Sequence, residues 1–127
     1  MSPTPVDSAT NLSRVVALTG VAWGAALAAR GPAIWRAVQS TAPGEGDRVA
    51  IWILAARHLG QGSLQALLPT HLRGLWLTVD ALHATTMAVV AIGDPGRRRA
   101  ALVTGGAAAL SAMGTAVSLA LSRSEQQ

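Results

Sequence analysis

The stretch AALVTGGAAALSAMGTAVSLAL, residues 100–121, decides the fold of this chain, because it carries no charged side chain on any face. A helix on the surface of a soluble bundle shows a polar face to water. A bilayer core, by contrast, is crossed by about 20 predominantly apolar residues. The stretch therefore predicts a membrane-spanning helix and disfavours an alanine-rich soluble bundle.

Three further apolar segments precede this one, separated by short stretches that hold nearly all the charges and most of the prolines. We expect helices over residues 12–30, 49–68, 75–93 and 100–121, with a short interfacial helix at 33–39 and irregular tails at 1–10 and 122–127. The lengths of the four main segments match a bilayer core. The predicted fold class is therefore all-α, with residues 1–127 forming a single domain, an integral membrane bundle of four transmembrane helices.

The composition supports a lipid environment and excludes several function classes. Half of the residues are hydrophobic and 13% are charged, against about 25% charged residues in ordinary soluble domains. All ten basic residues are arginines scattered between apolar runs, without an aromatic stacking platform, so nucleic acid is not an expected partner. The chain has no cysteine, which excludes disulfides, thiolate metal sites and a thiol nucleophile.

The arginines also predict an orientation in the cell membrane. Positive residues are more frequent in cytoplasmic loops than in loops on the other side. Six arginines fall on the first and third loops and three on the other side, namely Arg30, Arg36, Arg48 and Arg97 to Arg99 against Arg14, Arg73 and Arg123. We therefore expect a multi-pass protein with the first and third loops in the cytoplasm.

Small residues recur at helical spacing and predict close helix packing. Membrane helices associate through such faces, because burying apolar surface gains little in lipid. The first segment carries Gly20 and Gly24, continued by Ala28, and the fourth carries a ridge of alanines at 108, 112, 116 and 120 with Gly105 and Ala109 beside it. These faces serve equally for packing within one chain and for a homo-oligomer.

Four ionisable residues lie deep within the second and third apolar segments: Arg57, His58, Asp80 and His83. A charged residue at the centre of a membrane helix costs about 2.5–3.5 kcal/mol. An apolar residue returns only about 0.3–0.6 kcal/mol. One arginine therefore nearly cancels the apolar gain of the whole second segment, which indicates that it is paired.

Counting outward from the turn at residues 70–74 predicts which of these residues are level. In an antiparallel hairpin, His58 and His83 come to similar depth, and Asp80 comes near Gln61. Helical spacing places Arg57, Gln61 and Gln65 on one face of the second helix and Asp80, His83 and Met87 on one face of the third. If these two faces meet, they form a single polar site near the membrane midplane.

Two interpretations of such a site need no cofactor, and both stay open. In the first, Arg57 pairs with Asp80 and the histidines bond Gln61 or Gln65, so that the cluster only fixes helix packing in a structural or complex-forming subunit. In the second, the site binds a lipophilic small molecule or lipid through Gln61, Gln65 and Met87. Asp80, His83 and His58 would then move protons and Arg57 would hold a developing negative oxygen, as in an isomerase, cyclase or epoxide-opening enzyme.

A third interpretation is a cofactor site. His58 and His83 on neighbouring helices would ligate haem b axially, or would bind a divalent metal together with Asp80. Facing histidines one helix spacing apart leave little room for a porphyrin. Our primary expectation is therefore that the protein holds no cofactor. Whether the chain is an enzyme stays open at this stage.

The segments ARHLGQG, VDALHATTM and GRRRAA resemble small four-helix membrane proteins of actinobacteria whose activity is uncharacterised. The specific part of the likeness is R-H-x-x-Q followed by D-x-x-H, which marks Arg57, His58, Gln61, Asp80 and His83. The resemblance implies a membrane protein and an actinobacterial source. It implies no reaction.

Overall fold

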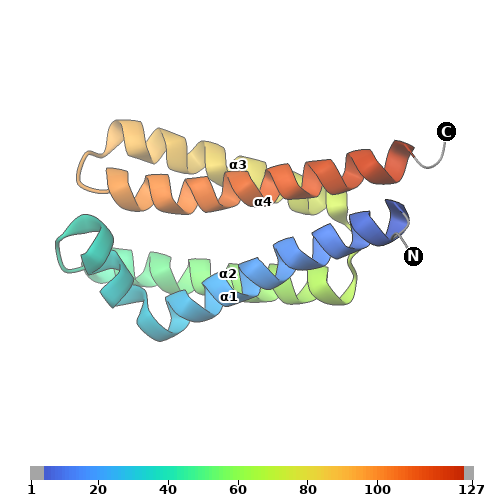
Figure 1. Cartoon of the computed structure of the whole chain (residues 1–127). Helices are drawn as coiled ribbons and strands as arrows, with labels where there is room; N and C mark the ends of the chain where they lie inside the picture. The colour runs from blue at the N-terminus through green and yellow to red at the C-terminus, as the bar shows by residue number, and fades with distance from the viewer. Residues whose placement is uncertain (1–4, 125–127) are drawn as a thin grey trace.

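The computed structural model describes residues 5–124, and this part of the chain consists of four helices without a strand. The helices are α1 (Pro5–Gln39), α2 (Glu45–Leu67), α3 (Arg73–Gly93) and α4 (Arg98–Ser124). Each helix runs antiparallel to the next, so that α1 begins and α4 ends at the same end of the bundle (Figure 1). The all-α prediction is confirmed for these residues.

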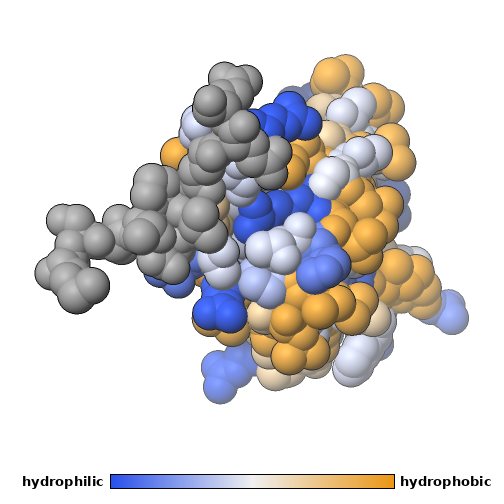
Figure 2. All heavy atoms as spheres, turned by 90° about the vertical axis from the view of Figure 1, so that its right-hand side faces the viewer, coloured by the Kyte–Doolittle hydropathy of each residue, from blue (hydrophilic) through white to orange (hydrophobic). Residues whose placement is uncertain are grey.

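Three of the helices are long and apolar enough to cross a membrane, namely α1 from Ser8 onward, α3 and α4. α2 does not reach this hydropathy, because it carries Arg57, His58 and two glutamines along its length. Large apolar side chains are widely exposed on the flanks, including Leu67 at 77% and Ile92 at 80%. Figure 2, which looks onto the end where α1 begins and α4 ends, shows apolar side chains along much of the visible edge.

α1 is longer than expected and is kinked. Arg30 has a non-helical backbone (φ −138°, ψ 18°) and stands two residues before Pro32. Proline lacks an N–H and its ring clashes with the carbonyl four residues back, so a helix bends where it contains one. Residues 33–39 therefore lie in a second helical segment beyond the kink, which agrees with the short helix expected there.

The expected tails also differ from the structure. Residues 5–10 belong to α1 and residues 122–124 belong to α4, so these parts of the predicted irregular tails are helical. The remaining tail residues, 1–4 and 125–127, lie outside the described part of the chain.

The helices associate as two hairpins. α1 packs against α2, α3 packs against α4, and α1 also packs against α4. Figure 1 shows the α1–α2 pair beside the α3–α4 pair. Within residues 5–124 the backbones of α2 and α3 make little direct contact. The polar faces of these two helices meet through long side chains, without close packing of the two backbones.

Glycines explain why α1 and α2 prefer each other. A Cβ atom on Gly24 would lie 2.8 Å from the backbone nitrogen of Leu59, and one on Gly62 would lie 2.7 Å from the carbonyl oxygen of Ala17. The two backbones therefore touch at this crossing, which only glycine permits. Gly24 belongs to the small-residue pattern seen in the sequence, whereas Gly62 was not singled out.

On α4, the buried residues are Ala101, Gly105, Ala108, Thr115 and Ser118. Gly105 and Ala108 belong to the predicted small-residue faces, while Ala112, Ala116 and Ala120 stay at least partly exposed. Packing within the chain thus uses only part of the predicted ridge.

Candidate functional site

The carboxylate of Asp80 is the centre of a hydrogen-bond network that joins three helices. Its Oδ1 atom accepts hydrogen bonds from Arg57 Nη2 at 2.7 Å and from Gln61 Nε2 at 3.0 Å. Its Oδ2 atom accepts one from Ser111 Oγ on α4 at 2.5 Å. Asp80 is only 1% exposed. We refer to these four residues as the Asp80 network.

The spacing along α2 accounts for two of these bonds. Arg57 and Gln61 lie four residues apart on one helical face, so both side chains reach the same carboxylate oxygen. The length of the arginine side chain spans the distance between α2 and α3, whose backbones do not pack together. The predicted Arg57–Asp80 pair and the predicted proximity of Asp80 to Gln61 are both present. Ser111 was not expected, because serines in membrane helices usually bond their own backbone.

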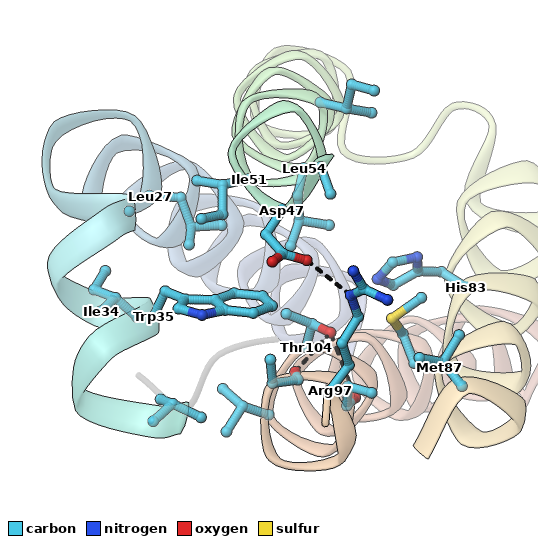
Figure 3. Close-up of a pocket in the computed structure, with 18 of the residues that line it drawn as sticks. Leu27, Ile34, Trp35, Asp47, Ile51, Leu54, His83, Met87, Arg97 and Thr104 are labelled. Atoms are coloured by element: carbon cyan, nitrogen blue, oxygen red, sulfur yellow. Dashed lines mark hydrogen bonds and ion pairs between the residues drawn. The ribbon is translucent and has the colours of Figure 1, made fainter. Parts of the chain in front are cut away.

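A cavity of about 580 Å³ lies between all four helices, on the side of the Asp80 network that faces the loops α1–α2 and α3–α4. Its volume falls within the range of about 300–1,000 Å³ that is typical of small-molecule sites. The kink in α1 places the segment after Arg30 as one wall of the cavity. Most of the lining is apolar, as Figure 3 shows, and includes Trp23, Leu27, Ile34, Trp35, Val38, Ile51, Ile53, Leu54, Met87, Val90 and Val103. We call it the larger cavity.

Polar residues stand at both ends of the larger cavity. Arg57 and His83 line its inner end, near the Asp80 network. At the outer end, Arg97 Nε donates to Asp47 Oδ1 at 2.8 Å, and Figure 3 shows this pair reaching across the cavity. Arg97 Nη1 also bonds Asp94 Oδ2 at 2.8 Å. The outer pair was missed in the sequence, where Arg97 was interpreted as part of a topology signal.

The surroundings of Asp47 stabilise its charged form. The hydrogen bond from Arg97 is the main reason why the pKa of Asp47 lies below its ordinary value of 3.8. The backbone N–H of Gly44, just before α2, also donates to Asp47 Oδ2 at 3.0 Å. Asp47 therefore caps the start of α2 and joins it to the α3–α4 loop.

A second cavity, of about 300 Å³, lies between α1, α2 and α4. It is lined by His58 on α2, by Ser111 on α4 and by several residues of α1, including Trp23, which also lines the larger cavity. His83 lines the larger cavity and not this one. The two predicted histidines therefore line different cavities.

The remaining candidate residues separate in the same way. Met87 lines the larger cavity, as its assignment to ligand binding requires. Gln61 and Asp80 line neither cavity and bond each other. Gln65 is 2% exposed, and its Nε2 atom has no hydrogen-bond partner, but it too lines neither cavity.

The cofactor alternatives find little support in this geometry. Among residues 5–124, no group of three or more His, Asp or Glu side chains is placed to hold a metal ion, so the three-ligand site on His58, Asp80 and His83 does not form. A haem held by both histidines would need them to face one space. They line separate cavities, so the residues present do not fit that group.

The opposite end of the bundle is held by a buried arginine that sequence reasoning assigned to a loop. Arg73 is 6% exposed; its Nε donates to the carbonyl oxygen of Pro69 at 2.7 Å and its Nη1 to Ser122 Oγ at 2.5 Å. Ser13 Oγ donates to the same Pro69 carbonyl at 2.9 Å. These bonds tie the α2–α3 turn to both α1 and α4. The only sequence signal was an arginine four residues after a proline, which is too common to be specific.

No protein-family model, no curated protein and no solved structure matches this chain. The function is therefore argued from the fold and from the residues around the two cavities.

Proposed function

We propose that this chain is a small four-helix protein of the cell membrane that binds a lipophilic small molecule in the larger cavity. The observation that carries the proposal is the cavity itself, about 580 Å³ in volume, with apolar walls from all four helices and with Arg57 and His83 at its inner end. An apolar cavity with a few convergent polar groups is the usual form of a small-molecule site.

The distribution of residues around α2 supports its role as the fourth membrane span. His58 and Gln65 are buried, while Trp52 is 63% exposed and Leu67 is 77% exposed. His58 and Gln65 therefore face the other helices while Trp52 and Leu67 face outward, as is typical of membrane helices with ionisable groups. The mean hydropathy of the helix does not distinguish these two faces. The first and third loops, where most arginines lie, would face the cytoplasm.

Entry from the bilayer is supported by the exposure of the lining residues. Ile53 on α2 and Val103 on α4 line the larger cavity and are 65% and 42% exposed on the flanks of the bundle. The cavity walls are thus continuous with the surface that would contact lipid chains. A lipophilic molecule would enter sideways without crossing water.

The geometry assigns different roles to the predicted acid–base residues. Asp80 lines neither cavity and already accepts three hydrogen bonds, so it would position Arg57 and not touch a bound molecule. His83 is the histidine at the larger cavity. Any isomerisation, cyclisation or epoxide opening there would pass its proton through His83, with Arg57 stabilising a developing negative oxygen.

Tryptophan fluorescence provides a test, since Trp23 and Trp35 line the larger cavity while Trp52 and Trp76 do not. A cavity reporter is made by replacing Trp52 and Trp76 with Phe, and a surface reporter by replacing Trp23 and Trp35 with Phe. Both are titrated in detergent with a long-chain bromoalkane, whose bromine quenches nearby tryptophan. We expect saturable quenching of the cavity reporter and only linear quenching of the surface reporter.

Blocking the cavity supplies the matched control. In the cavity reporter, Val90→Phe places a ring in the larger cavity, whereas Val89→Phe makes the same change at a residue that is 65% exposed on the same helix and does not line it. The saturable component should disappear with Val90→Phe and persist with Val89→Phe. Linear quenching of both reporters would instead favour a structural subunit whose polar residues only fix helix packing.

A further inference from the structure

We infer that the molecule bound in the larger cavity presents a neutral oxygen acceptor, such as a ketone, ester or quinone carbonyl, to Arg57 and His83. This inference rests on the proposed binding function and adds the chemical class of the ligand. It follows from the hydrogen-bonding character and from the charge of the residues around the cavity.

The side chains that line the larger cavity have spare donors. Four of their buried nitrogen atoms have no hydrogen-bond partner, namely Trp23 Nε1, Trp35 Nε1, Arg57 Nη1 and His83 Nε2. Indole and guanidinium nitrogens can only donate, and an imidazole Nε2 donates in one of its two neutral tautomers. No side-chain oxygen of a lining residue is among the buried unpartnered atoms of the described chain. A complementary ligand therefore supplies acceptors.

The position of the donors says where the acceptor lies. Arg57 and His83 both line the inner end of the cavity, whereas the Asp47–Arg97 pair at the outer end has its charges already matched. All four spare nitrogens are covered by neighbouring protein atoms. A bound molecule would therefore reach Arg57 Nη1 or His83 Nε2 only after that side chain rotates slightly. The rotation is favourable because the buried donor then gains a hydrogen-bond partner.

Charge distinguishes a carbonyl from a carboxylate. The positive charge of Arg57 is balanced by Asp80 at 2.7 Å, so the Arg57–Asp80 pair brings no net charge to the inner end of the cavity. Bringing an anionic head into this low-dielectric position would leave its charge uncompensated. A neutral carbonyl oxygen accepts the same hydrogen bonds without that cost.

The test uses the cavity reporter with three brominated probes of equal chain length: an alkane, a methyl ketone and a carboxylate. The surface reporter measures partition into detergent for each probe. We expect the ketone to bind about fivefold more tightly than the alkane, which corresponds to about one net hydrogen bond. The carboxylate should bind more weakly than the ketone.

Variants at His83 keep the inference falsifiable. His83→Phe keeps a ring but removes one of the two donors, so the preference for the ketone over the alkane should become smaller, and an unchanged preference would exclude His83 as a donor to the ligand. His83→Gln restores an N–H donor and should restore part of the preference. His71→Phe, at an exposed turn residue outside both cavities, should leave the preference intact.

The outcomes separate this inference from the proposal beneath it. Saturable binding of all probes with equal affinity for ketone and alkane overturns the acceptor inference and leaves the binding function standing. If the carboxylate binds most tightly of the three probes, the inference that the ligand is neutral is overturned. An absence of saturable binding for every probe overturns both.

Discussion

Arg57 and Asp80 form an ion pair of 2.7 Å between two helices whose backbones hardly touch. α2 packs against α1 and α3 packs against α4, so this pair is a cross-link between two hairpins. Gln61 and Ser111 add two further bonds to the same carboxylate. The Asp80 carboxylate therefore joins α2 to both α3 and α4, in addition to the direct packing of α1 on α4.

Removing Asp80 alone should strongly destabilise the protein. Asp80→Leu leaves the largely buried Arg57 without its counter-ion, and breaking a buried pair from one side costs about 3–5 kcal/mol. Arg57→Met with Asp80→Leu removes both charges and should regain most of that loss, because an apolar pair of similar volume is often tolerated. Thermal unfolding in detergent of the wild type, both single variants and the double variant gives the coupling energy. If the stability losses of the two single variants simply add in the double variant, Arg57 and Asp80 are not energetically coupled.

The crossing of α1 and α2 should be intolerant of even one methyl group. Gly62→Ala forces a Cβ to 2.7 Å from the carbonyl oxygen of Ala17, so the helices must separate. We expect a loss of about 1–3 kcal/mol, as for other overpacked sites. Gly60→Ala, on the same helix with nothing within 4 Å of the added atom, should be neutral or stabilising. Equal melting temperatures for the two variants would show that the crossing is looser than described.

The Asp47–Arg97 pair should make stability depend on acid pH. The pKa of Asp47 is below 3.8 in the folded chain, mainly because of the Arg97 hydrogen bond. A group with a depressed folded pKa contributes stability above its unfolded pKa and loses it as the pH falls through the folded value. The wild type should therefore lose stability on acidification through that range.

The matched variants for this pH dependence lie in the first turn of α2. Asp47→Asn should be less stable at neutral pH and should lack this acid-dependent part of the loss. Glu45→Gln, a change of another acidic residue in that turn, should retain it. Thermal unfolding midpoints measured from about pH 7 to about pH 3 follow both variants across the range where carboxylates titrate. If the unfolding midpoints of the wild type and of Asp47→Asn fell in parallel with pH, the Asp47–Arg97 pair would not contribute to the acid dependence of stability.

The passage of α2 through the membrane can be tested by cysteine labelling, because the chain has no native cysteine. Ser40 and His71 are exposed at opposite ends of α2. If α2 spans the membrane, Ser40→Cys and His71→Cys lie on opposite sides. In intact cells, an impermeant maleimide should label His71→Cys and not Ser40→Cys. Labelling of both positions would place α2 on the surface of the membrane.

The sequence predicts the local part of the site well, because that part depends on helical periodicity. Arg57 and Gln61 share a face by their spacing, and counting from the turn brings Asp80 to the depth of Gln61. Both relations hold in the Asp80 network. The apolar length of α4 likewise predicts a helix that is long and apolar enough to cross a membrane.

The arrangement of the helices was less predictable. The sequence suggests direct packing of α2 on α3, because their polar faces are complementary, but the backbone contact at Gly24 and Gly62 pairs α2 with α1 instead. In this arrangement, His58 and His83 line different cavities. Such a preference depends on the shape of two surfaces and leaves no periodic signal in either segment.

The partners of single side chains were the least predictable feature. Ser111 and Ser122 belong to a helix without a strong polar pattern, yet they bond Asp80 and Arg73 respectively. A hydroxyl has the same sequence signature whether it bonds its own helix or another one. The partner follows only from the three-dimensional arrangement.

The order of residues in the Asp80 network bears on how such a chain is made. Arg57 precedes its counter-ion by 23 residues. If α2 crosses the membrane as proposed, it would reach the bilayer during synthesis with its arginine unpaired, because α3 follows it in the chain. The retention of α2 in the membrane would then depend on the arrival of α3. The two helices would therefore insert together, although in the finished bundle α2 packs against α1 and α3 packs against α4.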